Sequence, residues 1–358
     1  MKNSAARSVL PRFTTNEHHA ALRVMPSKKN PSLTIALRLP NWVGDVCMSL
    51  PCIQWLANSD HDLVIYGRPW AQPLVAQFKP QAFVPLSGQF SEDLKATKAA
   101  QRSQQKACRG IILPDSLSSA TIFRLAGIPS LGYRHDGRSL LLRWPVTKTS
   151  PQWHASHKWW HLVKQAAQQW HLSPPENDPP HVLITPSPRD EQVAADLMRT
   201  EGLTPKDFVL VAPTATGLHK GQIKVWPHFE RLIQVLKAAG HRVVACPPVS
   251  EQEQVRLTTP SAQLIGPVGL AALAALAKQA SLVLCNDSGV SHLAAAVRAK
   301  QITLFGVTDP KLTGPMSPHA TVLGALGHWP DLETVLNVAI DELHRPSPAV
   351  QLADEQHR

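Results

Sequence analysis

Residues 285–297, CNDSGVSHLAAAV, place an acid, a hydroxyl and a glycine at the boundary between two patterns. A strand-like apolar run ends here, and a helix-like run of small residues begins. Asp287 closes the first run, and Ser288 and Gly289 open the second. Because a helix N-terminus offers free N–H groups and partial positive charge, the pattern predicts a phosphate-binding site. Ordinary helix capping explains the same residues equally well.

A second loop, residues 212–227, also leads from a strand-like run into a helix-like run. Its hydroxyl-bearing and basic side chains are Thr214, Thr216, His219, Lys220 and Lys224. Such groups can hold a phosphate through charge-assisted hydrogen bonds. The loop lacks the GxxxxGK[ST] spacing, which excludes a P-loop. The alternative is a solvated basic loop whose Trp226 packs in the core.

A third loop, PNWVGDVCMSLP at residues 40–51, carries one glycine and one acid. Gly44 permits a tight turn or a close approach of the backbone. Asp45 stands at the carboxyl end of a predicted strand, which is where open α/β sheets bind ligands. A carboxylate at this place predicts a general base, and a plain N-cap is the alternative reading.

Short apolar runs alternate with helix-like stretches in both halves of the chain. The strand-like runs are 33–39, 62–67, 82–86, 110–114, 207–213, 242–248, 262–266, 281–287 and 301–306. The helix-like stretches are 46–57, 91–107, 226–240, 250–257, 269–279, 289–298 and 334–345. This alternation predicts parallel sheets with helices on both faces. The proline-rich segment 171–191 predicts a linker between two such units, because proline interrupts helices and strands.

The composition excludes several classes of protein. With 43% hydrophobic residues the chain can build a sizeable core, so it is not a disordered protein. Five cysteines without a CxxC pair argue against a disulfide scaffold or a zinc site, and no HExxH or HxH spacing occurs. The longest apolar stretch, 269–285, is shorter than the roughly 20 residues that span a bilayer. The N-terminus lacks the apolar segment of a secretory signal.

The net charge of +10 is distributed unevenly. Residues 1–31 carry +5 and residues 32–180 carry +6, whereas residues 181–358 carry −1. An asymmetry of this kind indicates an anionic partner for the first half, which leaves nucleic acid, a membrane surface and an acidic substrate open.

Together the three loops resemble the ADP-heptose:lipopolysaccharide heptosyltransferases, glycosyltransferase family 9. Four motifs in chain order carry the resemblance: Asn41–Asp45, the K-x-W-P motif at Lys224–Pro227, the N-D-S-G-x-x-H motif at Asn286–Ala296, and Phe305–Pro310. Weaker matches are Pro69–Leu74, Leu113–Ser116 and Ala126–Tyr133. The resemblance covers about residues 33–343.

This resemblance implies a GT-B fold, in which two Rossmann-like α/β domains with parallel sheets face a central cleft. We expect a disordered basic tail at 1–31, an acceptor-binding domain at 32–175 and a proline-rich linker at 176–190. A nucleotide-sugar-binding domain at 191–345 and a second tail at 346–358 complete the expected organisation.

The resemblance also implies roles for individual residues. Asp45 resembles the general base that deprotonates the acceptor hydroxyl, Lys224 the lysine on the donor diphosphate, and Asp287 the acid that holds the donor sugar. The donor-binding candidates are Thr216, Lys220, Lys224, Glu251, Asp287, Ser288, Gly289 and His292. Glu251 would bind the ribose hydroxyls, and His292 either contacts the donor or is structural. No metal and no cofactor are expected.

The acceptor side departs from the family pattern. The acceptor-binding candidates are Asn41, Gly44, Arg68, Arg124, Arg134 and Arg138, and a solvated basic face explains the four arginines equally well. Asp115 replaces the usual asparagine and Ser118 replaces a common basic residue, which leaves the identity of the acceptor open. In the donor loop, residues 217–223 look partly inserted, so Lys220 either replaces or assists Lys224.

The sequence therefore predicts an inverting, metal-independent glycosyltransferase that moves heptose from ADP-heptose to the inner core of lipopolysaccharide. The expected partners are a nucleotide sugar, an anionic glycolipid acceptor and the inner-leaflet surface, with no nucleic acid. We expect a monomer in the cytoplasm, peripheral to the inner membrane of a Gram-negative bacterium. The alternatives are a GT-B enzyme for another nucleotide sugar, a sugar-nucleotide epimerase, and a basic nucleic-acid-binding protein.

Overall fold

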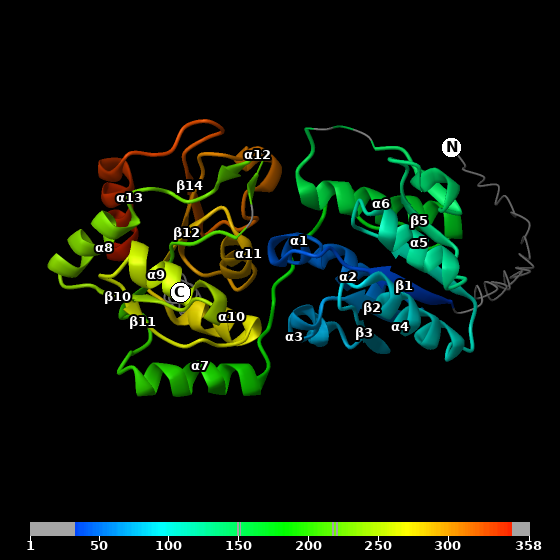
Figure 1. Ribbon diagram of the computed structural model, residues 1–358, viewed down its shortest axis with the longest axis horizontal. Coiled ribbons are helices and arrows are strands. Elements are labelled where there is room, and N and C mark those ends of the chain that lie inside the picture. Colours follow the sequence, from blue (N-terminus) through cyan, green and yellow to red (C-terminus); the bar gives the residue numbers. More distant parts are fainter. Residues whose placement is uncertain (1–32, 149, 151, 217, 220, 346–358) are drawn as a thin grey trace, which may run out of the picture. The chain divides into compact units, whose positions relative to one another are not determined.

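The computed structural model describes residues 33–148, 150, 152–216, 218–219 and 221–345 (Figure 1). The predicted tails at 1–31 and 346–358 lie outside the described residues, as does Lys220. Within the described residues, no helix combines the length and the apolar character needed to cross a membrane.

The N-terminal half contains a six-stranded sheet in the order β3-β2-β1-β4-β5-β6, and every neighbouring pair is parallel. Its strands are β1 Thr34–Arg38, β2 Asp62–Gly67, β3 Ala82–Pro85, β4 Cys108–Ile112, β5 Ser130–Tyr133 and β6 Trp144–Val146. All five residues of β1 are buried, as expected for an apolar strand at the centre of a parallel sheet.

Helices cover both faces of this sheet. They are α1 Val43–Met48, α2 Leu50–Ala57, α3 Gln72–Val75, α4 Phe90–Arg102, α5 Leu117–Leu125 and α6 Ala155–Trp170. Side chains alternate between the faces of a strand. Ile35 and Leu37 therefore pack in the core with α1, α2 and α6, whereas Ala36 packs in a second core with α4 and α5.

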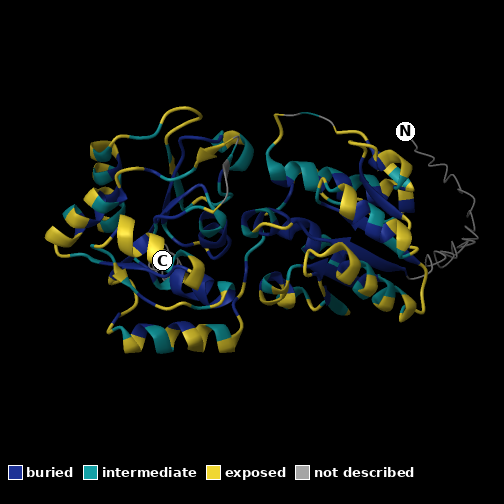
Figure 2. Ribbon diagram, viewed as in Figure 1, coloured by how far each residue is buried: buried dark blue, intermediate teal, exposed yellow. Residues whose placement is uncertain are grey.

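The C-terminal half repeats the same strand order, β11-β10-β7-β12-β13-β14, again with parallel neighbours. Its strands are β7 Phe208–Ala212, β10 Arg242–Ala245, β11 Gln263–Leu264, β12 Leu282–Asn286, β13 Gln301–Leu304 and β14 Ala320–Leu323, with a separate hairpin of β8 Leu218–His219 and β9 Gln222–Ile223. Its helices are α7 Pro188–Thr200, α8 Phe229–Ala238, α9 Gln252–Thr258, α10 Leu270–Gln279, α11 Gly289–Ala296, α12 Pro310–Thr313 and α13 Leu332–His344. Figure 2 shows the central strands of both halves buried beneath helices with exposed outer faces.

Two parallel α/β sheets confirm the predicted fold class, but two local expectations need correction. The single helix expected over 46–57 is divided into α1 and α2 at Ser49. Pro51 has no N–H for the carbonyl of Cys47, so the helix cannot continue through this point. Helix α7 begins at Pro188, inside the predicted linker, where Ser187 caps the N–H of Asp190.

The segment 171–187 between α6 and α7 contains no helix or strand. Gln77 fixes it to the N-terminal half, because its amide donates to the carbonyl of Leu183 (2.7 Å) and accepts from the N–H of Thr185 (2.7 Å). The N–H of Ile184 donates to the carbonyl of Ala296 in the C-terminal half (2.8 Å). The connection is thus tied to both halves.

Candidate active site

A cavity of about 510 Å³ is lined by all three loops that the sequence singled out. One loop follows β1, one follows β7 and one follows β12. In each sheet the strand order reverses beside these strands, and a topological switch point is where open α/β sheets bind ligands. Each loop enters the cavity from the carboxyl end of its strand.

Asp45 lies in the first turn of α1 and lines this cavity. Among the described residues, no group donates a hydrogen bond to its carboxylate. Burial raises the pKa of Asp45 to about 6, Lys224 opposes that rise, and Asp287 adds to it. A carboxylate with this pKa is ionised at neutral pH yet basic enough to accept a proton.

A basic and an acidic side chain contact each other on the side of the cavity where the sequence predicts donor binding. The ammonium of Lys224 donates to the backbone carbonyl of Asp287 (2.9 Å) and lies 3.4 Å from Oδ2 of the same residue. Oδ2 also accepts from the hydroxyl of Thr308 (2.5 Å). These bonds fix the positions of Lys224 and Asp287 before any ligand binds.

Asn286 joins the loops after β7 and β12, and it was not among the predicted site residues. Its Oδ1 accepts from the N–H of Trp226 (2.9 Å), and its Nδ2 donates to the carbonyl of Pro213 (3.0 Å). Trp226 is buried and its indole N–H donates to the carbonyl of Pro330 (2.8 Å). Asn286 belongs to the N-D-S-G motif, but only the fold reveals which loop its amide holds.

Helices α1 and α11 contact each other through glycines at their N-terminal turns. A Cβ on Gly44 would lie 2.6 Å from Cδ2 of His292, and one on Gly289 would lie 2.8 Å from Cβ of Val43. Real Cβ atoms do not approach so closely, so both positions require glycine for this contact. The contact places Asp45 against the helix that carries Ser288.

Ser288 is the N-cap of α11, and its buried hydroxyl has no hydrogen-bond partner among the described residues. His292, one turn further on, lines the cavity and is buried. Burial lowers the pKa of His292 to about 4, although Asp287 opposes the shift. The ring is therefore neutral at physiological pH, and it packs against Gly44.

The other donor-binding candidates that the structure describes also reach the cavity. Glu251 ends a short 3₁₀ turn after β10, and its carboxylate accepts from the hydroxyl of Thr214. Thr216 lines the cavity as an exposed residue. Lys220 lies outside the described residues, so whether it replaces or assists Lys224 stays untested.

The acceptor-binding candidates are dispersed over several places. Gly44 lines the large cavity, and Asn41 and Arg68 line a second cavity of about 120 Å³. Arg134 is exposed directly after β5. Arg124 is exposed in the last turn of α5. Since α5 begins beside the loop after β4, its last turn lies at the opposite edge of the sheet.

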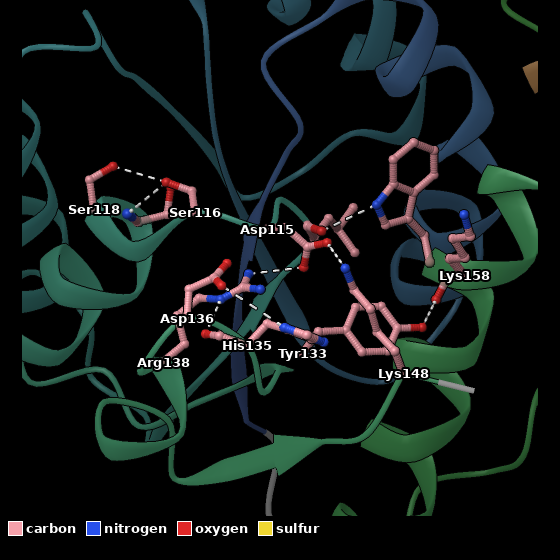
Figure 3. Close-up of polar contacts among 12 residues, drawn as sticks. Asp115, Ser116, Ser118, Tyr133, His135, Asp136, Arg138, Lys148 and Lys158 are labelled. Carbon is pink, nitrogen blue, oxygen red and sulfur yellow. Dashed lines mark hydrogen bonds and ion pairs between the residues drawn. The ribbon is translucent and has the colours of Figure 1, made fainter. Parts of the chain in front are cut away.

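Arg138 is buried and paired with the carboxylate of Asp115. Its Nη1 lies 2.9 Å from Oδ1 of Asp115, and Lys148 pairs with the other oxygen of the same carboxylate (Figure 3). Lys148 also lies over the ring of Tyr133, with its ammonium 5.8 Å from the centroid. The two cations that reach this point are thus neutralised in part by Asp115.

A metal would need a group of ligands, and the described residues contain no group of three or more His, Cys, Asp or Glu side chains that could hold one.

Comparison with known proteins agrees with the fold and the motifs. A sequence profile of glycosyltransferase family 9 (heptosyltransferase) matches residues 98–338. Lipooligosaccharide heptosyltransferase 2 of Haemophilus influenzae is 25% identical over 309 residues, which cover 79% of this chain and 86% of that protein.

Solved structures show the same fold. The E. coli ADP-heptose lps heptosyltransferase II is similar with a TM-score of 0.67 and 21% identity, covering 87% of this chain and 98% of that one. The E. coli heptosyltransferase WaaC with ADP-2-deoxy-2-fluoro heptose gives a TM-score of 0.60 and 19% identity, covering 91% and 100%. The family match, over two thirds of the chain, identifies an enzyme: the chain belongs to glycosyltransferase family 9, the heptosyltransferases.

Proposed function

We propose that the chain transfers heptose from ADP-heptose to the inner core of lipopolysaccharide, with inversion at the anomeric carbon and without a metal ion. One observation carries this proposal. Asp45, a half-buried carboxylate without a hydrogen-bond partner among the described residues, lines the same cavity as Lys224, Asp287 and the N-terminus of α11. The names of the relatives, which include lipooligosaccharide and ADP-heptose lps heptosyltransferases, support the donor and the acceptor.

The donor diphosphate fits the positive side of the cavity. Lys224 supplies a full charge, and α11 supplies free N–H groups and the unpartnered hydroxyl of Ser288. As the bond between the sugar and the diphosphate breaks, negative charge develops on the departing ADP. Groups fixed beforehand stabilise such charge without reorganising during the reaction. Glu251, held by Thr214, is placed to accept hydrogen bonds from ribose hydroxyls.

The acceptor hydroxyl would lie at Asp45. Asp45 takes its proton while the oxygen forms a bond to the anomeric carbon, and the bond to the diphosphate breaks with its electron pair leaving on ADP. Attack from the face opposite the leaving group inverts the configuration. The proton then passes from Asp45 to solvent, which restores the carboxylate.

The charge distribution supports a membrane-associated acceptor. Residues 1–180 hold the whole excess of positive charge, whereas residues 181–358 carry −1. Each basic residue near an anionic leaflet adds about 1 kcal/mol of attraction. We propose a monomeric cytoplasmic enzyme, peripheral to the inner membrane of a Gram-negative bacterium. Deleting residues 1–31 should weaken its binding to anionic liposomes, and unchanged binding would remove this support.

The test of the reaction uses the full chain and heptose-deficient lipopolysaccharide. Parallel incubations contain ADP-heptose or a set of UDP-sugars, each with and without EDTA and each with and without the acceptor. We expect heptosylated product from ADP-heptose and from none of the UDP-sugars, at the same rate with and without EDTA. Absence of transfer from ADP-heptose would refute the assignment, product without an acceptor would indicate an epimerase, and loss of rate in EDTA would refute metal independence.

A further inference from the structure

The second cavity, of about 120 Å³, lies beside the large one at the carboxyl edge of the N-terminal sheet. The loop after β1 separates them, because Asn41 lines the small cavity and Trp42 to Asp45 line the large one. The other wall residues come from the ends of β1 and β2, the segment after β3, and helices α4 and α5. A molecule that reaches Asp45 could therefore extend into both cavities.

Arg38 gives the small cavity a buried positive charge. Only 5% of its surface is exposed, and its guanidinium donates to the carbonyl of Leu39 and to Oδ1 of Asn41 (2.6 Å). Within the described part of the chain no carboxylate forms an ion pair with it. Buried charges are ordinarily paired, because an unpaired one loses its hydration without compensation. Burial lowers the pKa of Arg38 to about 10, so it remains protonated at neutral pH.

A second guanidinium lines the same cavity. Arg68 donates to the backbone carbonyls of Leu86 (3.4 Å) and Ser87, and none of the described carboxylates pairs with it. Asp93 is the acidic residue that lines this cavity, and its negative charge favours the protonated form of Arg38. Its oxygens already accept from the N–H of Gly88 (3.2 Å) and the hydroxyl of Ser87 (3.3 Å). The cavity therefore keeps a positive excess.

The N-terminal turn of α5 adds polar groups to the wall. Ser118 and Ser119 both line the cavity. Ser116 caps the N–H of Ser119 (3.2 Å), and its hydroxyl also lies 2.9 Å from that of Ser118 (Figure 3). The described residues provide no partner for the N–H of Ser118. A helix N-terminus beside two guanidinium groups favours an anion.

Among the basic groups of the N-terminal half, those that line this cavity differ from those that are paired with Asp115. Arg138 and Lys148 already share a carboxylate, whereas Arg38 and Arg68 share a cavity. We propose that this cavity, built by Arg38, Arg68 and the first turn of α5, binds a phosphate or carboxylate group of the acceptor while the acceptor's hydroxyl lies at Asp45. This inference rests on the proposed function, because it names the part of the acceptor that the site recognises.

The first experiment needs no transfer reaction. Thermal unfolding of the full chain is followed in saturating ADP, which fills the donor site, while inorganic phosphate is added. Phosphate should raise the melting temperature of the wild type and of Ser118→Asn. It should have little effect on Arg68→Gln or on Ser118→Asp, whose added carboxylate repels an anion. The same response in all four proteins would overturn the proposal.

Ser118→Asp should remain folded, because an acid in the first turn of a helix is stabilising and Ser118 is exposed. Its loss of phosphate binding would therefore not come from misfolding. Arg102→Gln, which removes an exposed charge from the last turn of α4, is the control for Arg68→Gln. Because these measurements are independent of heptose transfer, phosphate binding tests the site even if the proposed reaction fails.

The second experiment measures transfer kinetics. Arg68→Gln should raise the KM for the acceptor about tenfold or more, the usual effect of losing a hydrogen bond between charged groups. Ser118→Asp should also raise this KM, because its carboxylate repels the anionic group of the acceptor. The KM for ADP-heptose should stay unchanged. Dephosphorylated and carboxyl-reduced acceptors then identify the group, because the wild type and Arg68→Gln should become alike only when the bound group is missing. A change of less than twofold in the acceptor KM of both variants would contradict the proposal.

Discussion

The two halves of the chain share one strand order but satisfy the polar groups of their loops differently. In the C-terminal half, Lys224, Asp287 and Thr308 are joined by hydrogen bonds. In the N-terminal half, Asp45 accepts no hydrogen bond from any described residue, and Arg38 forms no ion pair with any of them, although the charge of Asp93 favours its protonated form. The donor side is thus assembled in advance, whereas the acceptor side holds charged groups that form no ion pair among the described residues.

This difference has a thermodynamic consequence. Hydrogen-bonded charges contribute rigidity, and a buried unpaired charge costs stability. The raised pKa of Asp45 means that the folded chain disfavours its ionised form. The cost is absent at low pH, where the group is protonated in both states, and is fully present above about pH 6. The acceptor side therefore keeps a reactive carboxylate at a cost in folding stability, and substitutions on the two sides of the cavity should have different effects.

Asp45→Asn should have the largest effect, because it removes the base and keeps the shape of the side chain. We expect kcat to fall about 10²–10⁴-fold, the usual contribution of general base catalysis. Its melting temperature at pH 7 should be no lower than that of the wild type, since the cost of the buried charge is gone. Initial rates and thermal unfolding measure the two effects.

The matched control is Asp136→Asn, which neutralises an exposed acid of the same half. It should leave kcat unchanged. If Asp45→Asn instead lost stability together with activity, the carboxylate would be part of the structural framework.

Lys224→Met should have the next largest effect, because it removes the preassembled charge from the donor side. We expect kcat to fall about 10²–10³-fold, as when one preorganised donor is lost from a reaction site. ADP should also bind more weakly, measured by titration calorimetry.

Lys278→Met, at an exposed lysine of α10, is the control. Unaltered ADP affinity in Lys224→Met would indicate that Lys224 does not contact the diphosphate. Lys220 would then be the lysine expected to make this contact.

Gly44→Ala tests the contact between α1 and α11 and should have the smallest effect of the three. Its Cβ would lie 2.6 Å from Cδ2 of His292, so the ring or a helix must shift. Overpacking of this kind costs about 1–3 kcal/mol of unfolding free energy. Denaturant unfolding measures the loss.

The added substitution His292→Ala should recover part of that loss by removing the ring. Gly132→Ala is the control, because its nearest atoms would lie at an ordinary 3.4 Å. If the double variant were no more stable than Gly44→Ala, the ring would not be the source of the strain.

The sequence predicted the fold where apolar runs were long and continuous. The runs 33–39 and 281–287 became the central strands β1 and β12, and parallel sheets followed from their alternation with helices. Other elements were not predicted: β5 and β6 have four and three residues, too few for a periodic pattern, and α6 was missed although it has 16 residues. The start of α7 was visible as Ser187-Pro188 followed by acids, but the prolines before it suggested only a linker.

The residues of the site could also be predicted only in part. Asp45 and Asp287 follow strands, so their place at the sheet edges could be inferred from the pattern. The partners that tune them could not, because Thr308 lies 21 residues from Asp287 and meets it only through the fold. Arg38 was not singled out, because nothing in an apolar strand shows which face its last residue occupies. Arg124 and Arg138 looked alike in sequence, yet one is exposed far from the site and the other is paired with Asp115.

The pH dependence of kcat/KM for heptose transfer tests the role of Asp45 most directly. Lys224, Asp287 and His292 are the charged or titratable groups named around it, and His292, with a pKa of about 4, does not change its charge between pH 5 and 7. We predict that kcat/KM falls about tenfold per pH unit below about 6, as the carboxylate of Asp45 becomes protonated. A rate that stayed constant down to pH 5, in a chain that is still folded, would contradict this account.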